Sequence, residues 1–315
     1  MLVRLLTLIC LASSSLAASA GIQVYAGGVA GVASLADPKA SLKFREAGGG
    51  LYLHNSGWGK LDLAQQQQVL TNFAKLPVAI ELGFGRSEAR AAAWSRRLQS
   101  GYLALGIKPA FIAANAFANN HHPTVEQWRD YTHALRSAGL PASTLVLPTF
   151  EYANFRANLA TLADNTVSKR RDFQELIRTA GGIVLDSPPG YSLRREANYR
   201  TWIIDAIHWT HQQGCTVVWI ASPNSSRDHF RSDTGKFLRL LKQKNALPDV
   251  IVCENYNPHP PRNYPNVVGD ENQPNTTLGV AWYLLNRFLP EIEVKREHSS
   301  VGQPDAHKPA SATNH

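Results

Sequence analysis

The chain lacks several features that would place it in a familiar class of protein. Its 315 residues include only three cysteines, which excludes a fold held together by many disulfides. No run of 18 or more apolar residues occurs beyond the extreme N-terminus, so a protein that crosses a membrane several times is excluded. Hydrophobic residues make up 44% of the chain, enough for a large core, and global disorder is therefore excluded as well.

Sequence motifs for common cofactors and nucleophiles are also missing. The turn after the first clear apolar segment reads His54-Asn-Ser-Gly-Trp58 and contains no G-x-G-x-x-G phosphate loop. No G-x-S-x-G motif marks a serine nucleophile. His121 and His122 are adjacent, which directs their side chains apart, and no third ligand follows at a suitable spacing. We therefore expect no metal site and no cofactor.

The N-terminal twenty residues have the pattern of a secretory signal peptide. Arg4 precedes the apolar run Leu5–Leu11, and small residues follow up to Ala18-Ser-Ala20. The apolar run is too short to span a bilayer. The pattern predicts cleavage after Ala20, a secreted or periplasmic location, and no integral membrane segment in the mature chain.

Two cysteines remain after this cleavage, and export would permit them to form a disulfide. Cys215 starts one predicted strand, whereas Cys253 lies well along the next. Their heights in a sheet should differ by more than the roughly 7 Å limit on Cα separation in a disulfide. Two free thiols are expected.

Short apolar segments alternate with longer amphipathic ones from Gly48 to Pro290, with about 30 residues in each repeat. Segments that are apolar on both faces indicate a parallel sheet covered by helices, and eight such units indicate a single-domain (β/α)8 barrel. An open doubly wound sheet is the alternative, and the missing phosphate loop weakens it. The expected strands are Gly50–His54, Val78–Glu81, Pro109–Ala113, Thr144–Thr149, Gly182–Asp186, Thr216–Ala221, Val250–Glu254 and Asn266–Gly269.

The rest of the chain lies outside this repeat. Residues 21–47 are expected to form an N-terminal extension that packs on the barrel, which itself occupies residues 48–290. Residues 291–315 are polar and are expected to be a disordered tail. A monomer is expected.

Carboxylates, amides and aromatic residues follow the expected strands, where a barrel of this kind carries its active site. This composition suits a neutral polyhydroxylated ligand, so a polysaccharide or oligosaccharide substrate is expected. The net charge of +8 favours anionic partners in general, but many of the Lys and Arg residues fall on predicted helices, and no nucleic acid is expected. The residues expected to bind substrate are His54, Glu81, Asn115, Tyr152, Tyr191, Trp219, Asn255, Tyr256, Asp270 and Glu271.

Glu151 follows the fourth expected strand, and Glu254 ends the seventh. In this respect the chain resembles the superfamily of (β/α)8 glycoside hydrolases that carry a Glu acid/base after strand four and a Glu nucleophile after strand seven. The resemblance implies that Glu151 protonates the leaving oxygen and that Glu254 attacks the anomeric carbon. The chain departs from the family pattern at one position, because Phe150, rather than Asn, precedes Glu151. Asp186 also ends an expected strand and could pair with either glutamate.

Two other functions remain open at this point. His54 and Glu81 resemble part of the site of metal-dependent glycerophosphodiesterase barrels, although Gly83 stands where that family has a second carboxylate. A carbohydrate-binding barrel without catalysis would keep the tyrosines and need no pair of carboxylates.

Overall fold

The computed structural model describes residues 21–115, 123–151, 166–194, 197–223, 229–255 and 268–292. The predicted signal peptide lies outside these residues, as does the predicted tail from residue 293 onward. The side chain of Ile292 is buried, so the packed part of the chain extends two residues beyond the expected boundary. Among the described helices, none has the length and apolar content that a membrane crossing requires.

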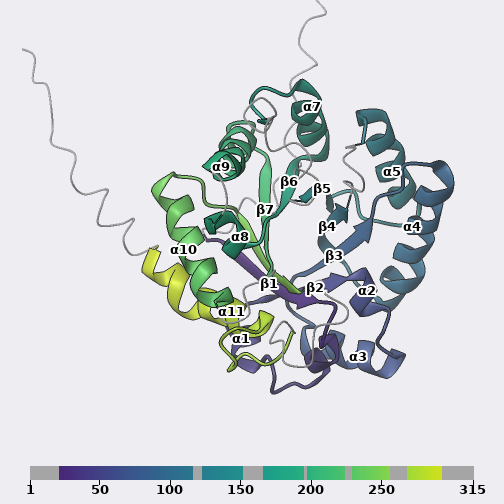
Figure 1. Ribbon diagram of the computed structural model, residues 1–315. Coiled ribbons are helices and arrows are strands. Elements are labelled where there is room, and N and C mark those ends of the chain that lie inside the picture. Colours follow the sequence, from purple (N-terminus) through teal and green to yellow (C-terminus); the bar gives the residue numbers. More distant parts are fainter. Residues whose placement is uncertain are drawn as a thin grey trace, which may run out of the picture.

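Eight parallel strands close into a single barrel, which confirms the predicted (β/α)8 fold (Figure 1). Neighbours in the barrel are also neighbours in the sequence, and β1 pairs with β8 to close the ring. The strands are β1 Gln23–Gly28, β2 Gly50–His54, β3 Val78–Gly83, β4 Pro109–Asn115, β5 Leu145–Glu151, β6 Gly182–Asp186, β7 Thr216–Ala221 and β8 Val250–Asn255.

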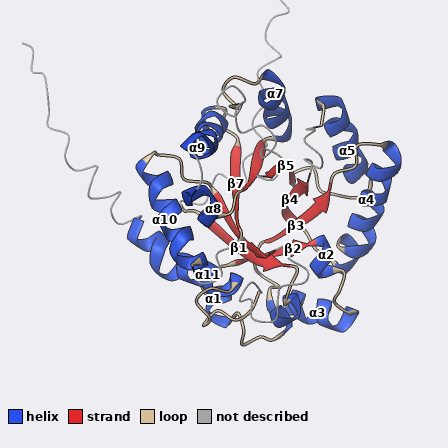
Figure 2. Ribbon diagram, in the orientation of Figure 1, coloured by secondary structure: helices blue, strands red, loops and turns tan. Residues whose placement is uncertain are grey.

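Helices surround the strands on the outside, as Figure 2 shows. Asp62 and Thr124 each form a capping box at the start of their helix, with Gln65 and Gln127 respectively. The α-helices are α1 Leu42–Glu46, α2 Asn55–Trp58, α3 Leu63–Asn72, α4 Glu88–Gly101, α5 Val125–Ser137, α7 Arg171–Ala180, α8 Pro189–Arg194, α9 Ala197–Gln212, α10 Phe230–Gln243 and α11 Thr277–Tyr283. Shorter turns are η1 Val32–Ala36, η2 Leu103–Leu105 and η5 Leu284–Phe288.

The numbering of the strands differs from the prediction by one. Residues 23–28, placed in an N-terminal extension by the sequence, form β1 and pair with both β2 and β8. The barrel is already closed at β8, and Val268 and Gly269 from the expected eighth strand are not in a strand. The other seven expected strands therefore each move up by one, so Glu151 ends strand five and Glu254 is the last residue but one of strand eight.

Alternate residues of each strand fill the barrel interior. This inner cluster is apolar and includes two tyrosines, of which Tyr25 packs edge-on against Phe111 with ring centroids 5.4 Å apart. The residues between them point outward and form a second, larger core with the helices. A strand residue therefore faces the barrel axis or the helix layer according to its parity.

Gly27 is the position at which β1 approaches its neighbours most closely. It pairs with Tyr52 of β2 on one side and with Glu254 of β8 on the other. A Cβ atom at Gly27 would lie 1.8 Å from the carbonyl oxygen of Tyr52, so only glycine fits. Because β1 contributes no side chain here, residues of β2 and β8 can meet across it.

Cys215 and Cys253 are both free, as predicted. Cys253 is fully buried in the core between the sheet and the helices, and burial raises the pKa of its thiol. Burial also raises the pKa of the half-buried Cys215 thiol. Neither cysteine has the thiolate character of a nucleophile.

Candidate active site at the barrel mouth

A layer of polar side chains lies directly above the apolar interior, at the carboxyl ends of the strands. Each of them follows an interior residue by two positions and so faces the barrel axis. The five residues are His54 after Tyr52, Glu81 after Ala79, Asn115 after Ala113, Asp186 after Val184, and Glu254 after Val252. The structure thus brings together five of the predicted site residues at the end of the barrel where catalysis takes place in this fold.

His54 lies between two carboxylates. Its Nε2 atom is 3.4 Å from Oε1 of Glu81 and 3.7 Å from Oε1 of Glu254. The Glu254 side chain is only 3% exposed, whereas those of His54 and Glu81 are 15% and 12% exposed. The three ligand-type atoms all lie within 4.8 Å of one another. This compact group, His54–Glu81–Glu254, is the centre of the candidate site.

Tyr52 lies beneath this group, inside the barrel. Its hydroxyl donates a hydrogen bond of 2.7 Å to Oε2 of Glu81, which leaves Oε1 of the same carboxylate directed at His54. Burial raises the Tyr52 pKa well above its ordinary value, and the nearby charges of Glu81, Glu254 and Asp186 raise it further. Tyr52 therefore remains a neutral donor at any physiological pH.

The orientation of the His54 ring is set from its other nitrogen. The backbone N–H of Ser56, at the start of α2, donates to Nδ1 at 3.1 Å, so His54 acts as the N-cap of this short helix. A neutral imidazole that accepts at Nδ1 carries its proton on Nε2, where it faces both carboxylates. Moving that proton to Nδ1 would cost one helix cap, about 1 kcal/mol.

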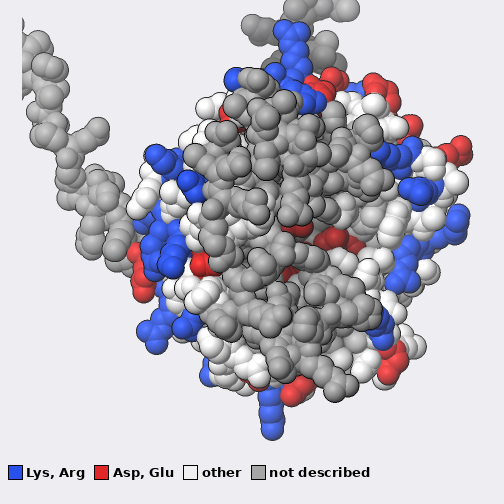
Figure 3. All heavy atoms as spheres, viewed as in Figure 1, with Lys and Arg blue, Asp and Glu red and all other residues white. Residues whose placement is uncertain are grey.

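Among the described residues, the strand ends at the mouth are acidic although the protein as a whole is basic. None of the eight strands contains a Lys or an Arg. Asp and Glu atoms are visible at the centre of the face in Figure 3, whereas the visible Lys and Arg atoms lie around its edge. The site therefore favours cations, protons or polar neutral groups over anions.

Two other predicted site residues, Trp219 and Asn255, face away from the mouth, and a third, Tyr191, packs within the helix that follows β6. Trp219 lies between two interior residues of β7, points outward, and donates from its indole N–H to the Ser187 carbonyl at 3.0 Å. Asn255 follows Glu254, is fully buried, and accepts from the Ala30 N–H at 3.4 Å. Tyr191 lies in α8 and packs edge-on against Tyr199 at 6.2 Å. Trp219 and Asn255 are fully buried, so the structure does not support the substrate-binding role predicted for them, and the role of Tyr191 stays a prediction.

Asp270 and Glu271 were also predicted to bind substrate, and they too have structural contacts. Oε1 and Oε2 of the buried Glu271 accept from the backbone N–H groups of Lys43 and Phe44, at 3.1 and 2.8 Å. These are early N–H groups of α1, so Glu271 caps a helix that is remote in sequence. Asp270 accepts from the backbone and side chain of Asn272 in the same turn.

Part of the predicted site lies outside the described residues. Tyr152 and Tyr256 belong to these segments. Glu151 ends β5 and its backbone is in register with Asp186, but the described part of the chain does not include its side chain.

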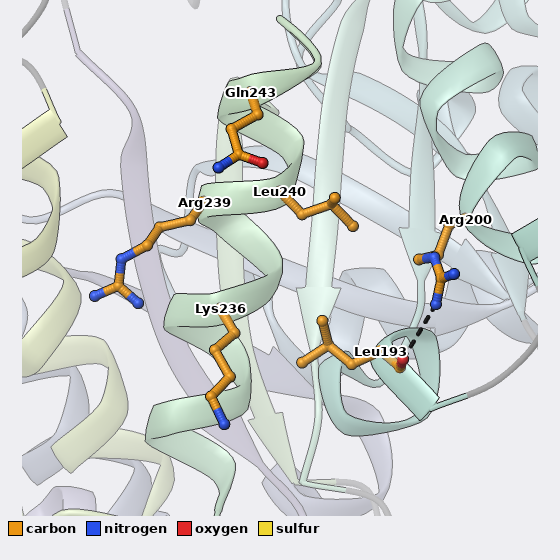
Figure 4. A pocket seen from close by; sticks show the side chains of 6 residues that line it. All are labelled: Leu193, Arg200, Lys236, Arg239, Leu240 and Gln243. Atoms are coloured by element: carbon orange, nitrogen blue, oxygen red, sulfur yellow. Dashed lines mark hydrogen bonds between the residues drawn. The ribbon is translucent and has the colours of Figure 1, made fainter.

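A hollow of about 410 Å³ lies on the outer surface, beside α8 and α10 (Figure 4). Its cations already interact with the protein, since Arg200 donates to the Leu193 carbonyl and the Arg239 guanidinium lies 5.2 Å from the Phe288 ring centroid. In Figure 4 Arg239 extends to the side of α10 opposite Leu193. No residue of the mouth contributes to this hollow.

Comparison with known proteins gives no family. No family model and no curated protein sequence matches the chain. Among solved structures, the malate synthase of Haloferax volcanii is 11% identical, with 90% of this chain and 80% of that chain covered and a TM-score of 0.46. A truncated 3-deoxy-D-arabino-heptulosonate 7-phosphate synthase from Thermotoga maritima is 14% identical, with 88% of each chain covered and a TM-score of 0.46. RipC from Yersinia pestis is 8% identical, with 87% and 98% covered and a TM-score of 0.42. At these values no activity can be transferred to this chain.

The interpretation as a glycoside hydrolase is wrong. It depended on glutamates after strands four and seven, and the closed barrel places Glu151 and Glu254 after strands five and eight. The roles that this interpretation gave to Glu151 as acid/base and to Glu254 as glycosyl nucleophile are therefore wrong as well.

Two residues of the site were missed by the sequence reasoning. Tyr52 could have been found from parity, because it precedes His54 by two residues in the same strand and so shares its face. Gly27 could not, because the segment around it was not recognised as a strand.

Proposed function

We propose that this chain is an enzyme whose substrate binds at the barrel mouth and whose reaction depends on proton transfer by the His54–Glu81–Glu254 group. The observation that carries the proposal is the position of His54 Nε2, within 3.7 Å of two carboxylates in the inward-facing layer. Close titratable groups with different surroundings are typical of acid–base sites.

The roles follow from exposure. Glu254 is almost fully buried, at the floor of the group, and holds the imidazole, while the more exposed His54 is the group that exchanges a proton with substrate. Glu81 is fixed by Tyr52 on one oxygen and supports His54 with the other. Asn115 and Asp186 face the same space and orient polar groups of the substrate.

A substrate-independent assay tests the proposal. Small-molecule extracts of cells and culture medium are incubated with wild type, with Glu254→Gln and with the control Glu88→Gln, whose side chain is exposed in α4. Mass spectrometry should show compounds consumed and formed by wild type and the control, and unchanged by Glu254→Gln. Identical profiles for wild type and Glu254→Gln would contradict the proposal.

A further inference from the structure

The His54–Glu81–Glu254 group has the donor set of a metal site. One imidazole nitrogen and two carboxylate oxygens are ligands for divalent transition metals, with the nitrogen favouring Zn²⁺ over Mg²⁺ or Ca²⁺. The three residues come from β2, β3 and β8, all at the same end of the barrel, and β1 lies between β8 and β2. They meet because Gly27 of β1 places no side chain between them.

The two separations between His54 Nε2 and the carboxylate oxygens are compatible with a shared metal ion. Zn²⁺ binds nitrogen and oxygen ligands at about 2.1 Å. With bonds of that length, the separations of 3.4 and 3.7 Å from Nε2 to the two Oε1 atoms correspond to ligand–metal–ligand angles of roughly 110° and 125°. These two angles are near tetrahedral. The carboxylate oxygens of Glu81 and Glu254, which lie within 4.8 Å of each other, must come within about 4.2 Å to share the ion.

The surroundings also favour a cation. Three carboxylates lie close enough to act on Tyr52, and no strand supplies a Lys or Arg to balance them. Tyr52 holds Glu81 by its second oxygen, as the outer partner of a metal ligand commonly does. Three protein ligands at the mouth leave a fourth position for water or substrate, the arrangement of catalytic rather than structural zinc.

We infer that His54 Nε2, Glu81 and Glu254 bind one divalent transition-metal ion, of the Zn²⁺ class, at the barrel mouth. Binding places the metal where the Nε2 proton lies in the metal-free protein. The imidazole proton then moves to Nδ1, and the Ser56 N–H, which is near the surface, exchanges that acceptor for water. The inference rests on the proposed function and changes one role in it: with Nε2 bound to the metal, His54 is a ligand, and the water or substrate group activated by the metal takes part in the proton transfer.

Co²⁺, a spectroscopic substitute for Zn²⁺, provides the test. The full chain is equilibrated with Co²⁺ by dialysis, and the metal content and visible absorption are measured for wild type and for His54→Gln, Glu81→Gln and Glu254→Gln. The exposed residues His133 and Glu88 supply matched controls, His133→Gln and Glu88→Gln. Wild type and controls should hold one more Co²⁺ per chain than the three site variants, with the intense absorption of four-coordinate Co²⁺. In the site variants the affinity should fall by about 100-fold or more.

Thermal unfolding keeps the test decisive if one variant folds poorly. Co²⁺ should raise the melting temperature of wild type more than that of any folded site variant. Equal Co²⁺ content and equal stabilisation in wild type and any folded site variant would overturn the inference. Extract turnover that persists in EDTA but is lost in Glu254→Gln would overturn the metal and leave the proposed function standing. If Co²⁺ binds to wild type but not to the site variants, and no turnover is found, the metal site stands and the proposed function is overturned.

Discussion

Two buried glutamates, Glu254 and Glu271, show how the same side chain serves different ends in two regions of this molecule. Their exposed fractions are 2% and 4%, so burial does not distinguish them. The Glu271 carboxylate accepts hydrogen bonds from two backbone N–H groups of α1, which hold it in place. The Glu254 carboxylate faces His54, which itself faces a second carboxylate. The partners, and not the depth, separate a structural carboxylate from a reactive one.

The difference has an energetic side. A carboxylate at a helix N-terminus completes hydrogen bonds that the helix cannot make itself and is favoured by the helix dipole. A carboxylate beside another carboxylate gains less and repels its neighbour unless a proton or cation lies between them. We therefore expect Glu271 to matter for stability and Glu254 to matter for activity, and four experiments examine this contrast.

The largest effect is expected for Glu254→Gln. Loss of a carboxylate that holds the proton-transferring histidine should reduce kcat/KM by about 10²–10⁴-fold. The free energy of unfolding should change by less than about 1 kcal/mol, because the amide has the same shape and relieves a repulsion with Glu81. Steady-state rates on a substrate found in the extract assay, together with urea unfolding, measure both. A large loss of stability would place Glu254 with Glu271 as a structural group.

The opposite result is expected for Glu271→Ala. Removing the cap leaves the N–H groups of Lys43 and Phe44 without an acceptor in a buried region, which should cost about 2 kcal/mol. For a domain of this size the melting temperature should fall by about 4–8 °C. Circular dichroism melting checks this, with the near-isosteric Glu271→Gln as a milder control. A normal melting temperature combined with lost turnover would return Glu271 to the substrate site.

These contrasts also show what the sequence could and could not predict. The alternation of apolar and amphipathic segments predicted the (β/α)8 barrel, and that prediction is confirmed. The starting strand was missed because Gln23–Gly28 ends in two glycines and offers a single β-branched residue, Val24. A βα repeat keeps its period when one unit is lost at the start and one is added at the end. The strand numbers, and the family resemblance that depended on them, were therefore wrong while the fold was right.

The site residues also divide into those that a local sequence pattern indicates and those that depend on the three-dimensional arrangement. His54, Glu81, Asn115, Asp186 and Glu254 were identified because a strand end is visible in the sequence. Trp219 and Asn255 each lie next to an inward-facing strand residue, so their parity indicates that they face away from the barrel axis. The role of Glu271 depends on a contact with α1, more than 200 residues away, which no local pattern reveals.

Tyr52→Phe should have an intermediate effect that sharpens the comparison. The change removes the 2.7 Å hydrogen bond to Glu81 and keeps the ring that fills the barrel. Stability should change by about 1 kcal/mol, and kcat/KM should fall by about 10-fold because Glu81 loses its fixed orientation toward His54. A pH–rate profile gives the readout specific to a positioning role, since the pH dependence of turnover should change when Glu81 loses this orientation. An unchanged profile with reduced stability would make Tyr52 a core residue only.

The smallest expected effect concerns alkaline pH. Burial and nearby carboxylates raise the pKa of Tyr52 above its ordinary value near 10. The folded protein therefore keeps this proton at a pH where the unfolded chain releases it. Tyr52 contributes its full share of stability below about pH 10, and that share is lost as the pH rises above this value. Melting temperatures measured from pH 8 to 11 should fall above pH 10, and the fall should be shallower in Tyr52→Phe.

Because Tyr25, Tyr131 and Tyr199 are buried with raised pKa values as well, Tyr52→Phe should retain most of the decline in melting temperature. Tyr25→Phe, inside the barrel but away from the carboxylates, is the matched control, and an equal flattening in both variants would show that burial alone governs the effect.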